Sequence, residues 1–201
     1  MALSMIGRFD EARGLCRDSH ELHLELLGFE AGDEDMWRVE MLAGELGAAE
    51  AHAQRSRGKL AELGDLSYGS TAAVQWALTC YGLGRFEDAR RLARECRDTG
   101  ASDDVVNQYL WRCVEAGVLA HEDRLEEADR LIDEAVDWVE RTDALLDQAT
   151  VYGFRAEISA RLGRSDDAQA ALAKARGAAV RKGATVVVEQ VDRQAAELGL
   201  T

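Results

Sequence analysis

The chain has 201 residues, and its 24 Lys and Arg against 38 Asp and Glu give it a formal net charge of −14. Such a balance argues against a nucleic-acid-binding protein, which needs a basic face for the phosphates, and against docking on anionic membranes. Proline is absent, and Ala, Leu, Glu and Arg, which all favour helices, dominate the sequence. We therefore expect an all-α protein.

The sequence predicts neither a membrane span nor a signal peptide. No run of about 18 apolar residues occurs, and Arg8 and Asp10 interrupt the start of the chain before a signal-peptide core can form. Four cysteines lie among apolar residues without forming a Cys-x-x-Cys pair: Cys16, Cys80, Cys96 and Cys113. Burial of reduced thiols is the simplest interpretation, and a disulfide or metal role is the alternative. We expect a cytoplasmic protein.

Hydrophobic periodicity and polar breaks predict the helices in chain order. Residues 1–6 give only about a turn and a half before the first break. Longer helices follow at about residues 9–27, 34–43, 46–63, 66–83, 86–97, 125–140, 144–162 and 165–181. Another helix, capped by Ser102 or Asp103, ends near His121. Residues 185–188 are β-branched, which permits a strand, but the apolar spacing beyond them favours a capping helix at 186–198.

A hexapeptide with the properties of a helix-to-helix turn recurs along the chain. In its central copy, Gly84 can adopt the left-handed conformation that ends a helix, Phe86 is an apolar anchor, and Ala89 leaves room for a neighbouring helix. The copies begin at Gly7, Gly44, Gly84, Asp123 and Gly163, with spacings of 37, 40, 39 and 40 residues. So constant a period is typical of a helical-repeat array, and we treat residues 1–201 as one such domain.

These motifs resemble the tetratricopeptide family. That family places a small residue seven positions before the turn glycine, an aromatic residue two positions after it and an alanine five positions after it. This chain has three matching sets: Ala77, Gly84, Phe86 and Ala89; Ala116, Leu125 and Ala128; and Ala156, Gly163 and Ala168. The resemblance covers nearly the whole chain. The period exceeds the family's ~34 residues, the proline that usually ends a repeat is missing, and Trp37 stands where a small residue is usual.

Motifs for catalysis are missing from the sequence. There is no Gly-Lys-Ser or Gly-Lys-Thr phosphate loop and no nucleophile elbow, so we expect no enzyme and no cofactor. His20 and His23 can share a helix face, but no further ligands converge on them, so we expect no metal site. Three arginines share another face, where they can grip a partner's carboxylate or pair with acids of their own or the next repeat: Arg90, Arg94 and Arg97.

The resemblance implies a right-handed α-solenoid of about five antiparallel helix pairs with a C-terminal capping helix. The first helix of each pair then lines a concave groove, which we expect to bind a peptide or protein partner. The repeat register places the following residues on the groove: Thr71, Val74, Leu78, Tyr81, Leu110, Gly117, Thr150 and Glu157. The longer repeat looks like the arrays that follow the regulatory ATPase module of large bacterial signalling proteins, some of which carry a nucleotide cyclase. The alternative function is therefore a C-terminal regulatory segment that packs on such upstream domains.

The N-terminal end of the array is expected to be open. Only residues 1–6 precede the first turn, so the first helix of the first pair is missing, as in a chain cut from a longer protein. Four apolar residues after this turn should then be less covered than their counterparts around the central turn: Phe9, Ala12, Leu15 and Cys16 against Phe86, Ala89, Leu92 and Ala93. We expect such an end to fray or to self-associate.

Overall fold

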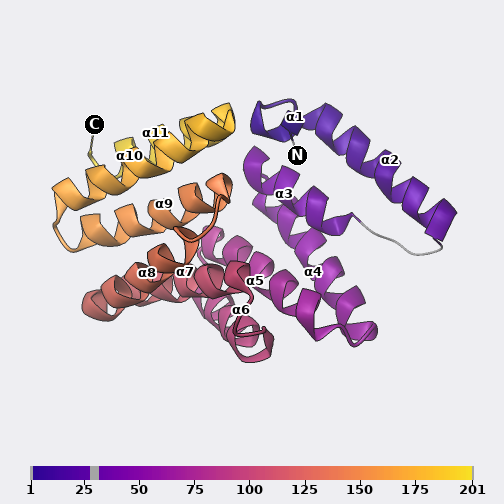
Figure 1. The fold of residues 1–201 in the computed structure, drawn as a ribbon, viewed down its shortest axis with the longest axis horizontal. Coiled ribbons are helices and arrows are strands. Elements are labelled where there is room, and N and C mark those ends of the chain that lie inside the picture. Colours follow the sequence, from indigo (N-terminus) through magenta and orange to yellow (C-terminus); the bar gives the residue numbers. More distant parts are fainter. Residues whose placement is uncertain (1, 28–31, 201) are drawn as a thin grey trace.

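The computed structural model describes residues 2–27 and 32–200, and all regular secondary structure in these residues is helical (Figure 1). The helices are α1 (Ala2–Met5), α2 (Phe9–Leu27), α3 (Asp33–Ala43), α4 (Leu46–Glu62), α5 (Leu66–Gly82), α6 (Phe86–Thr99), α7 (Val105–His121), α8 (Leu125–Val139), α9 (Leu145–Arg161), α10 (Ser165–Lys182) and α11 (Thr185–Glu197). Consecutive helices pack on one another, as in a helical-repeat array. The expectation of an all-α fold is confirmed.

The recurring turn adopts one conformation at all five positions. Its first residue has a positive φ each time, from 59° at Asp123 to 80° at Gly7. In the central turn, the Arg85 amide donates to the Cys80 carbonyl at 2.9 Å and the Gly84 amide donates to Tyr81 at 2.9 Å, which together cap the end of α5. Asp123 can replace glycine because Asp tolerates the left-handed region better than bulky residues do. The sequence motif is therefore a helix C-cap followed directly by a new helix.

Small residues lie where the helices approach one another. The six alanines that the motif places before and after the turns have no exposed surface: Ala77, Ala89, Ala116, Ala128, Ala156 and Ala168. A methyl side chain lets two helix backbones come close, and the larger residues beside it fill the remaining space. The core runs through the array as two groups of buried side chains, one centred on α5–α8 and the other on α9–α11.

Two predicted helix boundaries are wrong, and the last helix is confirmed. Asp104, rather than Ser102 or Asp103, caps α7, since its carboxylate accepts the Asn107 amide at 3.3 Å. Helix α6 continues to Thr99 instead of ending near residue 97. The β-branched segment at residues 185–188 is helical, because Val187 and Val191 bury one face of α11 against α9 and α10.

The N-terminal end is more closed than its sequence suggests. Residues 2–5 form the short helix α1, which packs on α2, α3 and α11. The hydroxyl of Thr185 in α11 donates to the Met5 carbonyl at 3.5 Å, so the first and last helices touch (Figure 1). Ala12 is consequently buried to 2% exposure, which contradicts the expectation for that residue. The expectation is confirmed for Leu15 and Cys16, which are less buried than Leu92 and Ala93.

The three arginines of α6 pair with acids of this protein, and two of them join α6 to the next helix pair. The Arg90 guanidinium makes two hydrogen bonds to the Glu122 carboxylate, at 2.6 and 2.7 Å, and its Nε lies 3.3 Å from Glu115. Arg94 reaches the same Glu115 at 3.5 Å, and Arg97 pairs with Asp98. The arginines were expected either to bind a partner's carboxylate or to pair with acids of their own chain, and in the structure they pair with acids of their own chain.

Candidate functional site

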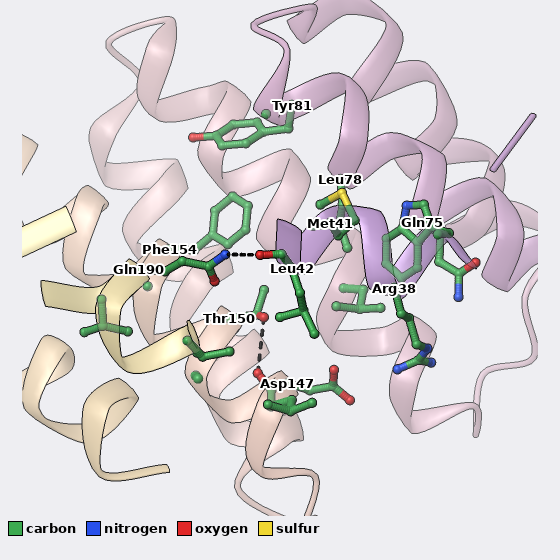
Figure 2. Close-up of a pocket in the computed structure, with 18 of the residues that line it drawn as sticks. Arg38, Met41, Leu42, Gln75, Leu78, Tyr81, Asp147, Thr150, Phe154 and Gln190 are labelled. Carbon is green, nitrogen blue, oxygen red and sulfur yellow. Dashed lines mark hydrogen bonds between the residues drawn. The ribbon is translucent and has the colours of Figure 1, made fainter. Parts of the chain in front are cut away.

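A cavity of about 380 Å³ lies among the helices that begin each pair (Figure 2). Its lining comes from α3, α5, α7, α9 and α11, and the second helices of the pairs contribute none of it. The lining residues are Trp37, Arg38, Met41, Leu42, Thr71, Gln75, Leu78, Tyr81, Gly82, Val106, Leu110, Leu146, Asp147, Ala149, Thr150, Gly153, Phe154, Glu157, Val187, Gln190, Val191 and Gln194. Its volume falls within the range of small-ligand pockets, roughly 300–1,000 Å³.

Part of the wall that α3 and α5 form is apolar. Met41 and Leu78 lie side by side there (Figure 2). Trp37 adds its indole ring, whose Nε1 donates to the buried Thr79 hydroxyl at 2.9 Å. Because the only polar atom of the indole is bonded inside the core, the ring offers the cavity an apolar surface. This wall suits a large apolar group.

One end of the cavity holds a carboxylate among aromatic rings. The Tyr81 hydroxyl donates to Glu157, with its oxygen 3.0 and 3.1 Å from the two carboxylate oxygens, and thus links α5 to α9. Burial, followed by the charge of Glu157, raises the pKa of Tyr81 well above its ordinary value, so the hydroxyl keeps its proton. His121 lies 3.4 Å from Glu157 and stacks on Phe86 with 4.0 Å between ring centroids. Burial and then Arg161 lower the pKa of His121.

Arg38 and Asp147 lie at the other end of the cavity, away from Tyr81 (Figure 2). The buried Tyr109 hydroxyl donates to one carboxylate oxygen of Asp147 at 2.7 Å. The Arg38 guanidinium donates to Glu34 in its own helix at 2.9 Å. The cavity thus has an apolar middle, with the Arg38 guanidinium and the Asp147 carboxylate at one end and the Glu157 carboxylate at the other.

Helix α11 closes the side of the cavity that α9 leaves uncovered. The Gln190 side-chain amide donates to the Leu42 carbonyl of α3 at 3.1 Å (Figure 2), and Gln194 donates to the Gly153 carbonyl of α9 at 3.0 Å. Val187 and Val191, on the same face, complete the wall. The capping helix is therefore part of the cavity, and it joins the C-terminal end of the array to α3.

The structure brings most of the sequence-predicted groove residues together. Six of them line the cavity: Thr71, Leu78, Tyr81, Leu110, Thr150 and Glu157. Val74 has no exposed surface and packs in the core instead. Gly117 is buried beneath Tyr81, where an added Cβ would lie 2.6 Å from the Tyr81 ring. Sequence reasoning placed α3 on the groove but named none of its residues, and it missed the contribution of α11, for which the Val187, Gln190, Val191 and Gln194 spacing was the available signal.

Within residues 2–27 and 32–200, no group of three or more His, Cys, Asp or Glu side chains is arranged to hold a metal ion. Cys80, Cys96 and Cys113 are buried free thiols, as predicted, whereas Cys16 is half-buried. No helix in the same residues combines the length and the hydropathy that a bilayer span requires.

Comparison with known proteins adds no identification. No protein-family model matches the sequence, and no curated protein matches it significantly. The likeness to tetratricopeptide arrays therefore rests on the turn motif and its period and stays a prediction.

Proposed function

We propose that this protein is a binding module whose cavity captures an apolar segment of a peptide or protein partner. In this proposal the chain is a right-handed solenoid of about five tetratricopeptide-like repeats, and its first helices form the binding face. The observation that carries the proposal is the makeup of the cavity. An apolar middle is bounded by Arg38 and Asp147 at one end and by Glu157 at the other.

Each part of the cavity has a role in this binding mode. The wall formed by Trp37, Met41 and Leu78 takes one or two large apolar side chains of the partner, and their burial supplies the affinity. Arg38 and Asp147 are placed to bond main-chain or polar groups at one end of the segment, which fixes its direction. The cavity is walled by packed helices, so little ordering of the protein opposes binding.

A display selection of short peptides against the protein tests this function. Thr150 is an exposed residue of the lining, so Thr150→Trp fills the cavity while leaving the core of α9 intact. Peptides enriched on the unmodified protein should carry a large apolar anchor and should bind Thr150→Trp at least about tenfold more weakly. Thr99→Trp, at the exposed end of α6 and away from the cavity, is the matched control and should bind them normally. Peptides that bind both variants equally would contradict the proposal.

A further inference from the structure

A row of exposed leucines runs along α2, separate from the cavity. Leu15, Leu22 and Leu26 are 60%, 53% and 68% exposed, and we call them the leucine seam. Their spacing of seven and eleven residues places Leu22 and Leu26 about 20° to either side of Leu15 around the helix axis. This is the spacing at which one helix meets another in a coiled coil. Leu24 is also exposed, but it lies about 180° from Leu15 and is not part of the seam.

The first leucine of the seam lacks the cover that its counterpart in the centre of the array receives. Helix α2 lies at the edge of the molecule, where α1 and α3 are the main helices packed on it (Figure 1). In the central pair, Leu92 of α6 occupies the position equivalent to Leu15 and is only 1% exposed, because α5 and α7 cover it. Leu15 is therefore an exposed residue at a position that neighbouring helices cover in the central pair.

The charges beside the seam indicate what kind of helix fits it. Asp18, Glu21 and Glu25 are all exposed and follow one long edge of the seam, within about 120° of Leu15 around the axis. The nearest unopposed cation, Arg17, lies about 160° from Leu15 on the far side. Arg8, at the N-terminal end of the seam, already bonds Glu11 at 2.6 Å. The accessible edge is thus acidic over its whole length.

The same charges disfavour a second copy of this chain as the occupant. If two copies of α2 paired antiparallel through their seams, the acidic edges would face each other across the contact. The opposite edge, at Cys16 and His23, is half-buried against the molecule and is not free to pair instead. Two molecules that each carry a net charge of −14 also repel as they approach.

We propose that the leucine seam of α2 is a docking surface for a basic amphipathic helix of another polypeptide. The apolar stripe of that helix packs on the three leucines, and its Lys or Arg side chains lie along the edge formed by Asp18, Glu21 and Glu25. The surface is distinct from the cavity, so either proposal can fail without the other.

Fluorescence anisotropy with two labelled synthetic helices of about 18 residues tests the proposal. Both carry the same leucine stripe; one is flanked by Lys and the other by Glu. The Lys helix should bind, and added salt should weaken its binding, whereas the Glu helix should bind at least about tenfold more weakly. The variant Leu22→Asp should weaken the Lys helix by at least about tenfold, and the double variant D18K/E25K should remove the preference for Lys over Glu.

Two controls locate the binding. Leu63→Asp changes a leucine that is 79% exposed at the end of α4, and Thr150→Trp fills the cavity; both should leave binding of the Lys helix unchanged. Leu22 is exposed, so its replacement should preserve the circular-dichroism melting curve, which verifies that the variant is folded. Equal binding of the Lys and Glu helices, or equal loss with Leu63→Asp, would overturn the proposal. A stable dimer that Leu22→Asp dissociates would also overturn it, since the occupant would then be a second copy.

Discussion

Helices α2 and α6 begin after the same turn motif, yet they are covered very differently. Leu15 and Leu92 occupy equivalent positions, and their exposed fractions are 60% and 1%. Helix α6 lies between α5 and α7, whereas α2 has α3 on one side and only the short α1 at its start. In a repeat array each pair is stabilised by its neighbours, so position in the array decides how much a given side chain contributes. The same motif therefore gives α2 and α6 the same local structure, and we infer that their neighbours set how stable each helix is.

The largest difference between the two helices should appear on truncation of their equivalent leucines. Leu92→Ala removes a fully buried side chain and should lower the free energy of unfolding by about 2–5 kcal/mol. Leu15→Ala removes an exposed side chain and should change it by no more than about 0.5 kcal/mol. Urea denaturation of the two variants measures both values. If the two variants lost similar amounts of unfolding free energy, the proposed difference between α2 and α6 would be wrong.

Enlarging a buried alanine should reveal how tightly the central helices pack. Ala128 has no exposed surface at the start of α8, so Ala128→Leu should overpack the contact and cost about 1–3 kcal/mol of unfolding free energy. Ala170→Leu, at an exposed site of α10, is the control and should be close to neutral. An unchanged denaturation midpoint for Ala128→Leu would mean that the assigned register is wrong.

Asp33 joins the N-terminal region to the rest of the array. Its carboxylate oxygens lie 2.9 Å from His52 Nδ1, 3.2 Å from Arg55 Nε and 2.9 Å from Lys59 Nζ, all in α4. Burial opposes the ionised form, but the bonds from His52 and Lys59 outweigh it and hold the pKa of Asp33 far below its usual range. Asp33→Asn should therefore cost about 2 kcal/mol at neutral pH, where the charge is present.

The pH dependence of this loss follows from the sign of the shift. A depressed carboxyl pKa stabilises the fold above the unfolded-state value of about 3.9, and this stabilisation falls as the pH drops towards the folded-state pKa. The difference between the unmodified protein and Asp33→Asn should thus be constant near neutrality and shrink below about pH 4. Denaturation midpoints over a pH series measure it, with the exposed Asp98→Asn as a control that should change little. A difference that grows as the solution is acidified would contradict the assignment.

The smallest expected effect concerns the helix that closes the array. Gln190→Ala removes the bond from α11 to the Leu42 carbonyl and should cost about 0.5–1.5 kcal/mol. Because Leu42 belongs to α3, the loss should also speed amide exchange in α3. Glu189→Ala, at the neighbouring exposed position, serves as the control. Faster exchange that stays within α11 would show that this contact does not couple the two ends.

The sequence predicted the local structure well, because the turn motif specifies where one helix ends and the next begins. A left-handed cap and a small residue recur at each turn, an apolar anchor recurs at four of the five, and the helices begin and end within a few residues of the predicted positions. Six groove residues were also found, since repeat register carries a position from α5 to α7 and α9. The same register reaches α3, where it carries Leu78 and Tyr81 onto the lining residues Arg38 and Met41, but the contribution of α11 could not be found this way. Leu42 and Gln190 are 148 residues apart, and their contact depends on how the whole array curves.

Hydrogen exchange of the backbone amides tests the central claim, that neighbours rather than the motif set stability, most directly. The amides of residues 86–97 lie in a helix covered by α5 and α7, and those of residues 15–26 lie in the more exposed part of α2, which packs on α3 and, at its start, on the short α1. In a dilute solution of the monomer, residues 15–26 should exchange markedly faster, while residues near Ala12, which α1 helps to cover, should be intermediate. Equal protection of residues 15–26 and 86–97 would contradict the account.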